Sequence, residues 1–167
     1  KIICSIESES LKITNFLLSK TFCPDVINDL KPFLYLLIDN GIFDYKFLTD
    51  YWRFCSQSFL FEKNDIYIDL IVYSLKVLDI YCINEFISFI QSESSPFFYK
   101  LLSKIVFGFQ NNDEFLEISN SCIKTLLSFA KTDDDASNEL KNLIENQLND
   151  YLYESLITEL LPYLNET

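Results

Sequence analysis

The sequence predicts an all-α fold of stacked antiparallel helix pairs, an armadillo- or HEAT-like segment of a right-handed superhelix. No stretch shows the alternating pattern of a β-strand, whereas apolar residues recur at spacings of three and four, as on one helix face. Predicted helix starts fall near residues 25, 44, 64, 84, 96, 113 and 134. Consecutive pairs therefore occupy roughly 40 residues, as HEAT or armadillo units do.

The first helix is expected from Asp25 to Asp39. Pro24 precedes its start, and Gly41 follows its end, where glycine adopts the left-handed conformation that terminates a helix. Pro32 lies inside the helix and is expected either to kink it or to restart it nearby.

The second helix is expected from Asp44, as N-cap, to about Ser56. One of its faces is apolar at spacings of three and four, and we expect that face to be buried. The face consists of Phe47, Leu48, Tyr51, Trp52 and Cys55.

The third helix is expected from Asn64 to Asp79 and is apolar almost all round. Its charges, Asp69, Lys76 and Asp79, form one narrow stripe, so neighbouring helices must cover the other sides. The apolar positions are Ile66, Ile68, Leu70, Ile71, Val72, Leu75, Val77 and Leu78. A membrane span is not expected, because each charge near its centre would cost roughly 2.5 to 3.5 kcal/mol.

The later helices are expected at 84–91, 97–109, 113–131 and 134–164, the last divided near Asn149 and closed by Pro162. Asn84 and Ser95, which precedes Pro96, are the predicted caps, and Asp113 begins the next helix. The run Asp133, Asp134, Asp135 offers anionic side chains to the start of the last region, where the helix dipole favours them. In the last region a leucine-rich seam recurs every four residues. It comprises Leu140, Ile144, Leu148, Leu152, Leu156 and Leu160, with Leu143 and Ile157 beside it.

The net charge is −12 over 167 residues, with no basic patch. Such a surface repels phosphate backbones, so nucleic acid is not an expected partner, whereas a basic protein surface is permitted. We expect one helical-repeat domain over residues 1–167. Because Met is absent and Lys1 comes first, we also expect this sequence to be a fragment of a longer chain.

Five cysteines lie far apart and form no C-x-x-C pair, so neither a zinc site nor a disulfide framework is indicated. Buried free thiols in a reducing, cytoplasmic compartment are the expectation. The five are Cys4, Cys23, Cys55, Cys82 and Cys122.

The sequence contains no histidine, which excludes Ser-His-Asp and Cys-His catalysis and histidine metal sites within it. We therefore predict no catalytic residue, no metal ligand and no cofactor. A Ser-x-x-Lys pattern at Ser121 and Lys124 leaves an enzyme as the weaker alternative. On the favoured interpretation Lys124 faces water, and its neighbours Cys122 and Ile123 point inward.

Two carboxylate pairs, Asp65 with Asp69 and Glu114 with Glu117, share helix faces, as a glycosidase pair could, but surface charge is the favoured interpretation. An aromatic group could bind a partner, but a core role is favoured. That group is Trp52, Phe97, Phe98 and Tyr99.

One stretch, Asn40 to Phe89, resembles part of the helical-repeat region outside the catalytic domain of the giant fat-facets-type ubiquitin-specific peptidases. The residues that carry the resemblance are Leu48-Thr49-Asp50-Tyr51-Trp52, Glu62, Asp69-Leu70-Ile71, Leu75 and Asn84-Glu85-Phe86. The family's active-site Cys and His boxes have no match here. The resemblance implies a supporting arm that helps to position ubiquitinated substrates or partners.

These observations favour a non-catalytic helical-repeat scaffold for protein–protein interaction. The alternatives are a HEAT-like adaptor unrelated to ubiquitin and a compact helical enzyme with a carboxylate or Ser-Lys site. Protein partners are expected, whereas nucleic acid and membrane are not.

Overall fold

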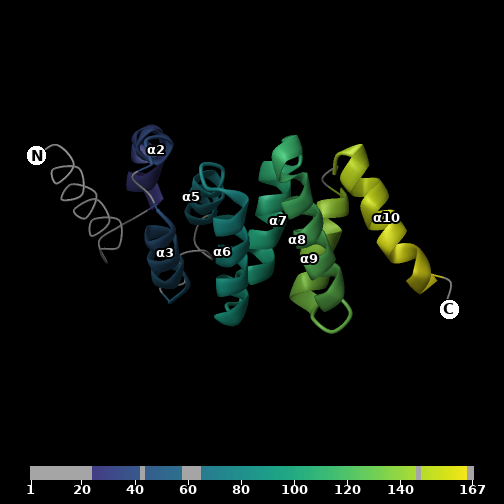
Figure 1. Cartoon of the computed structure of the whole chain (residues 1–167). Helices are drawn as coiled ribbons and strands as arrows, with labels where there is room; N and C mark the ends of the chain where they lie inside the picture. Colours follow the sequence, from purple (N-terminus) through teal and green to yellow (C-terminus); the bar gives the residue numbers. More distant parts are fainter. Residues whose placement is uncertain (1–23, 42–43, 58–64, 146–147, 165–167) are drawn as a thin grey trace, which may run out of the picture. The chain divides into compact units, whose positions relative to one another are not determined.

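The computed structural model describes residues 24–41, 44–57, 65–145 and 148–164 (Figure 1). These residues form eight α-helices and one short 3₁₀ helix, and none of them lies in a β-strand. The predicted all-α class is confirmed. Expectations that concern Cys4, Cys23 and Glu62 lie outside the described residues.

The chain divides after Ser95 into two compact units. The first contains α2 (Pro24–Asp39), α3 (Tyr45–Gln57), α5 (Ile66–Leu75) and α6 (Ile80–Ser92). Within it α5 packs against α2 and α3, and α3 packs against α6. The predicted extent of the domain, residues 1–167, stays a prediction.

Helix α2 ends as the sequence predicts. Gly41 has a φ of +70°, and its N–H donates to the carbonyl of Ile38 at 2.8 Å. Pro32 lies within α2, so the helix does not restart there.

Helix α3 also follows the prediction. The Asp44 carboxylate accepts the N–H of Phe47 at 2.8 Å, which satisfies one of the free donors at the helix start. All five residues of the predicted apolar face are buried, and Trp52 is completely enclosed.

Helix α5 is enclosed as predicted but shorter. Among its residues only Asp69 and Tyr73 keep partial exposure, and the Tyr73 hydroxyl donates to Asp39 at 3.0 Å while its ring stacks on Tyr35. The buried residues are Ile66, Tyr67, Ile68, Leu70, Ile71, Val72, Ser74 and Leu75. A helix buried this completely needs neighbours on several sides.

The predicted boundary between the third and fourth helices was wrong. Helix α5 ends at Leu75, and α6 begins at Ile80 rather than after Asn84. The reason is Asp79, which is the N-cap of α6. Its backbone is extended, and its side-chain carboxylate accepts the N–H of Cys82 at 2.8 Å. Val77, expected on the covered helix, lies in the intervening turn and is 43% exposed.

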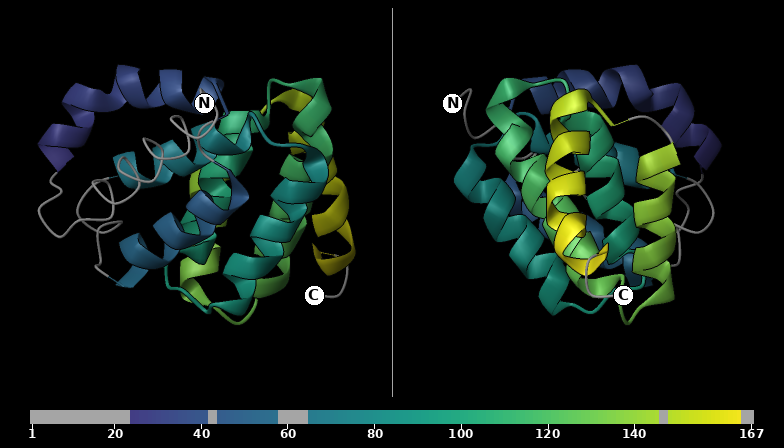
Figure 2. Two further views of the ribbon diagram at one scale, coloured as in Figure 1. Left: turned by 60° about the vertical axis from the view of Figure 1, so that its left-hand side comes forward. Right: turned by 90° about the vertical axis from the view of Figure 1, so that its right-hand side faces the viewer.

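The second unit contains α7 (Phe98–Phe109), the 3₁₀ helix η1 (Asp113–Phe115), α8 (Leu116–Phe129), α9 (Asp134–Glu145) and α10 (Asp150–Leu164). Helix α8 is the central one, because it contacts α7, α9 and α10; α7 also contacts α9. Figure 2 shows these helices side by side from two directions.

The predicted cap Ser95 was wrong, because the N-cap of α7 is Phe97, which makes no side-chain cap hydrogen bond. Side-chain caps precede η1, α9 and α10 near the predicted places. Asn112 accepts the N–H of Glu114 at 3.1 Å, and Asp133 accepts the N–H of Asp135 at 2.9 Å. Asn149 accepts the N–H of Leu152 at 2.9 Å, which confirms the division of the last region. Pro162 lies within α10, not after it.

The predicted leucine seam was partly wrong. Leu140, Leu148, Leu152 and Leu156 are buried, whereas Ile144 is 40% exposed and Leu143 is buried instead. Ile157, predicted beside the seam, is also 40% exposed. A strict four-residue repeat drifts around a helix of 3.6 residues per turn, and the break before α10 resets the phase.

One pair of helices in each unit is shown by its contacts to run parallel. Arg53 on α3 bonds to Glu93, 40 residues later, and Ser56 bonds to Ser95, 39 residues later. Because both residue numbers increase together, α3 and α6 point the same way. In the second unit Asn120 bonds to Ser155, 35 residues later, and Lys124 pairs with Glu159 at the same offset, so α8 and α10 are also parallel.

Candidate interaction surface on helices α3 and α6

The Ser-x-x-Lys residues lie on the exposed side of α8. Ser121 and Lys124 are exposed, and the Lys124 ammonium pairs with the Glu159 carboxylate at 2.9 Å. Cys122 and Ile123 point inward, as expected. Because both polar groups are open to water, nothing in their surroundings activates a serine nucleophile.

The predicted carboxylate pairs lie on helix surfaces. Glu114 and Glu117 are exposed, and Asp65 and Asp69 are half-buried. No group of three or more Cys, Asp or Glu side chains among the described residues is placed to hold a metal ion.

The described thiols are free. Cys55 and Cys122 are buried, which raises the pKa of Cys55 strongly and that of Cys122 to about 12. Cys82 is only half-buried, so the expectation of burial was too strong for this residue. Its pKa is raised by desolvation and by the Asp79 carboxylate 3.7 Å from its sulfur. Raised pKa values keep these thiols protonated and weakly nucleophilic at neutral pH.

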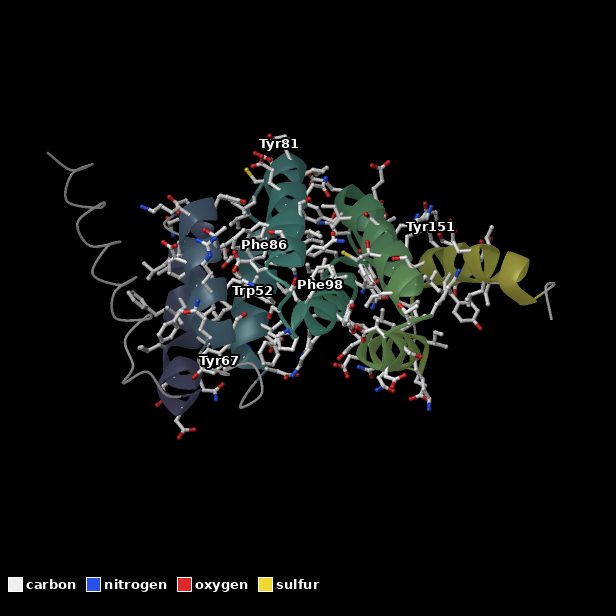
Figure 3. All side chains as sticks on the ribbon, turned by 90° about the horizontal axis from the view of Figure 1, so that it is seen from below. Trp52, Tyr67, Tyr81, Phe86, Phe98 and Tyr151 are labelled. Atoms are coloured by element: carbon white, nitrogen blue, oxygen red, sulfur yellow. The ribbon has the colours of Figure 1, made fainter. Side chains whose placement is uncertain are left out.

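The predicted aromatic group belongs to the cores of the two units. Trp52 is enclosed, Phe97 and Phe98 are buried, and Tyr99 is half-buried with its hydroxyl on Asp133 at 3.0 Å. Figure 3 shows Trp52 among the inner side chains, whereas Tyr81 extends from the start of α6.

A groove of about 250 Å³ lies on the second unit, lined by residues of α8, α9 and α10. Its floor includes Leu127, Leu140 and Leu160, and its rim carries the ion pair between Lys124 and Glu159. Lys131 also lines the groove, so the lining contains two lysines and one glutamate.

A second hollow, of about 470 Å³, opens on the first unit between α3 and α6. Its aromatic walls are Tyr45, Tyr81 and Phe89, and its polar lining is Asn84, Glu85 and Ser88. Tyr81 is 70% exposed, the largest exposure among the large apolar and aromatic side chains that the structure describes. We call this site the α3–α6 hollow.

Among the residues that the structure describes, Glu85 is the only charged one that lines the α3–α6 hollow. The Tyr81 hydroxyl donates to Glu85 at 2.8 Å, and this hydrogen bond is the main reason why the pKa of Tyr81 is raised. Burial and the charge of Glu85 raise the pKa of Tyr45. Both phenols therefore stay protonated at neutral pH, and the hollow has a net negative charge.

Directly beyond the hollow, the two helices already hold a cation. The Arg53 guanidinium lies over the Phe89 ring, 4.8 Å from its centroid, and bonds to the Glu93 carboxylate at 3.0 Å. This contact combines a cation–π interaction with a charge-assisted hydrogen bond.

Sequence reasoning missed the α3–α6 hollow because its residues come from two helices. A signal was present in α6, where Tyr81, Glu85 and Phe89 are four residues apart and lie within about 80° of one another around the helix. The helix start predicted at Asn84 excluded Tyr81 from that face.

Comparison with protein-family models, with curated proteins and with solved structures gives no match. None of the helices in the described ranges is long and apolar enough to cross a lipid bilayer.

Proposed function

We propose that this chain is a non-catalytic helical-repeat scaffold that binds protein partners on the surface of its stacked helices. The observation that carries the proposal is the parallel stacking of α3 on α6 and of α8 on α10, at offsets of 35 to 40 residues. Stacking of every second helix at such an offset is how helix-pair repeats build a solenoid.

The enclosure of α5 supports the same arrangement, because a short helix buried on nearly all sides is the inner member of a layered array. An armadillo- or HEAT-like right-handed superhelix is the finer architecture that we propose. Unpartnered apolar side chains on α2 and α10 fit a repeat array, whose helices present flat faces to neighbours. They are Phe33 and Leu36 on α2, and Tyr151, Tyr153 and Ile157 on α10.

The resemblance of residues 40–89 to the giant ubiquitin-specific peptidases supports a role as their supporting arm, which would position ubiquitinated substrates. A HEAT-like adaptor unrelated to ubiquitin shares every structural feature and is the alternative. For both, we propose a cytoplasmic location, which free thiols at Cys55, Cys82 and Cys122 support.

Reconstitution with purified components tests this proposal. Partners captured by the chain from cell extract would be purified and mixed with it again, and cross-links would be mapped by mass spectrometry. We expect a purified protein to bind again and to cross-link to the described helices. Failure of every purified candidate to bind would refute the scaffold. Hydrolysis that Ser121→Ala or Lys124→Ala abolishes would favour the enzyme. Parallel titration with ubiquitin separates the peptidase arm from the unrelated adaptor.

A further inference from the structure

We propose that the α3–α6 hollow binds an arginine or lysine side chain in a basic segment of the protein partner. This inference rests on the proposed scaffold function, because it names the kind of partner that one surface of the scaffold selects. Three features of the first unit lead to it: an internal model of the contact, a repeat of its residue spacing, and a carboxylate without a cation.

The internal model is the contact of Arg53 with Phe89 and Glu93. It shows that an aromatic ring and a carboxylate one turn apart on α6 can together hold a guanidinium beside α3. The cation stacks 4.8 Å from the ring centroid and bonds to the carboxylate at 3.0 Å.

The same residue spacing recurs eight positions earlier on both helices. Tyr81 and Glu85 on α6 correspond to Phe89 and Glu93, and Tyr45 on α3 stands where Arg53 stands in the internal model. Eight residues are about 2.2 helical turns, so the earlier set lies about 12 Å along the axes and about 80° around them. Its residues still meet, because Tyr45, Tyr81 and Glu85 line one hollow. The earlier set therefore has the ring and the carboxylate but not the cation, and at this place the hollow opens.

Charge makes a cation the suitable occupant. Within the described ranges no lysine or arginine forms an ion pair with Glu85. The Glu85 carboxylate accepts a hydrogen bond from the Tyr81 hydroxyl and lines the hollow. Asp79 adds negative charge at the start of α6, and the whole chain carries −12, whereas Glu93 at the other end is neutralised by Arg53. An anionic ligand would be repelled, whereas a guanidinium or ammonium would gain the Glu85 carboxylate and the ring faces of Tyr45 and Tyr81.

The first test uses the whole chain and two synthetic peptides. One has a single arginine among glycines and serines, and the other has citrulline, the uncharged analogue of arginine, at that position. Binding is followed by backbone amide shifts in two-dimensional NMR. We expect the arginine peptide to shift the amides of Tyr81, Glu85 and Phe89 with a dissociation constant near about 1 mM, and the citrulline peptide to bind about 5- to 10-fold more weakly.

Variants locate the effect. Glu85→Gln should weaken the arginine peptide about 5- to 10-fold, and Tyr81→Leu about 2- to 5-fold, since one removes the charge and the other a ring face. Glu117→Gln, which removes an exposed carboxylate of α8, is the matched control and should change binding less than 2-fold. All three side chains are exposed, so circular dichroism should be unchanged.

Tyr45→Arg tests the proposed site most directly, because it places a cation of the chain itself where the partner's cation is proposed to lie. Its guanidinium should reach Tyr81 and Glu85 as Arg53 reaches Phe89 and Glu93, and peptide binding should fall at least about 10-fold. Tyr45→Phe keeps the ring and should bind within about 3-fold of the original chain.

Two results would overturn the inference: equal binding of the citrulline peptide, or equal losses from Glu85→Gln and Glu117→Gln. The first would show that charge is irrelevant, and the second that only the overall negative field acts. A reconstituted protein partner whose affinity is unchanged by Glu85→Gln and Tyr45→Arg would also overturn it while leaving the scaffold intact. If no partner can be reconstituted but the peptide binds with the expected variant pattern, the scaffold fails and the cation site stands.

Discussion

Replacing Ile71 by alanine tests whether α5 is the enclosed helix of the first unit. Ile71 is completely buried and lines a residual cavity of about 10 Å³ together with Leu34, Ile38 and Leu48. Ile71→Ala removes three buried carbons, which cost about 2.4 kcal/mol in transfer free energy at about 0.8 kcal/mol each. The new void adds a cavity term, because close-packed neighbours collapse only partly, so we expect a loss of about 3 to 4 kcal/mol.

The free thiol of Cys55 reports this loss locally. It is buried on α3, which packs against α5, and its raised pKa keeps it protonated until the unit opens. If closing is faster than labelling, the labelling rate follows the equilibrium population of the open state. A loss of 3 to 4 kcal/mol should then speed alkylation of Cys55 about 150- to 900-fold, as read by peptide mass spectrometry.

The matched control is Ile80→Ala in the same unit. Ile80 is 40% exposed at the first position of α6, so the same three carbons are only partly buried. We expect a loss below about 1 kcal/mol and an increase in Cys55 labelling of less than about 5-fold. Equal rates for the Ile71 and Ile80 variants, or a change of less than 5-fold for Ile71→Ala, would refute the enclosure of α5.

Three further substitutions test local features by urea denaturation. Asp44→Ala should lower the free energy of unfolding by about 1 kcal/mol, because the N–H of Phe47 loses its acceptor at 2.8 Å, whereas Asp44→Asn should lower it less. Gly41→Ala should cost about 1 to 2 kcal/mol through its φ of +70° alone, since an added Cβ meets nothing within 4 Å, and Gly41→Asn should cost less. Tyr51→Phe should be neutral or stabilising within about 1 kcal/mol, because the buried hydroxyl has no nitrogen or oxygen hydrogen-bond partner in the described structure and interacts with the Cys55 thiol and the nearby Tyr67; a loss above about 1.5 kcal/mol would contradict this.

Local chemistry explains which parts of the fold were predictable. The end of α2 at Gly41 and the start of α3 at Asp44 each depend on one residue whose conformation or side chain suits only that position. Asp79 shows where the same reasoning failed, because an aspartate can be a helical surface residue or a cap. The apolar pattern from Ile66 to Leu78 favoured the first role, and the hydrogen bond to Cys82 shows the second.

The burial of a side chain was predictable where the apolar pattern of its own helix determines it. It was less predictable where the packing of several helices determines it. The face of α3 that contains Trp52 follows from spacing alone. The choice between Leu143 and Ile144 does not, since it depends on which side of α9 meets α7 and α8. A four-residue spacing continued across the break before α10 selected the wrong one.

The α3–α6 hollow shows a more general limit of sequence patterns within one helix, which do not reveal a surface that two helices form together. In a parallel stack, residues about 40 positions apart become neighbours, as Arg53 and Glu93 do. A binding surface in such a stack is therefore divided between distant segments: α6 supplies two rings and the carboxylate, and α3 supplies Tyr45 opposite them. Once one interhelical pair fixes the register, however, the remaining neighbours follow by equal steps along both helices. That register places Tyr45 beside Tyr81 and Glu85, so an offset of about 40 residues, confirmed by a single contact, is enough to find the site.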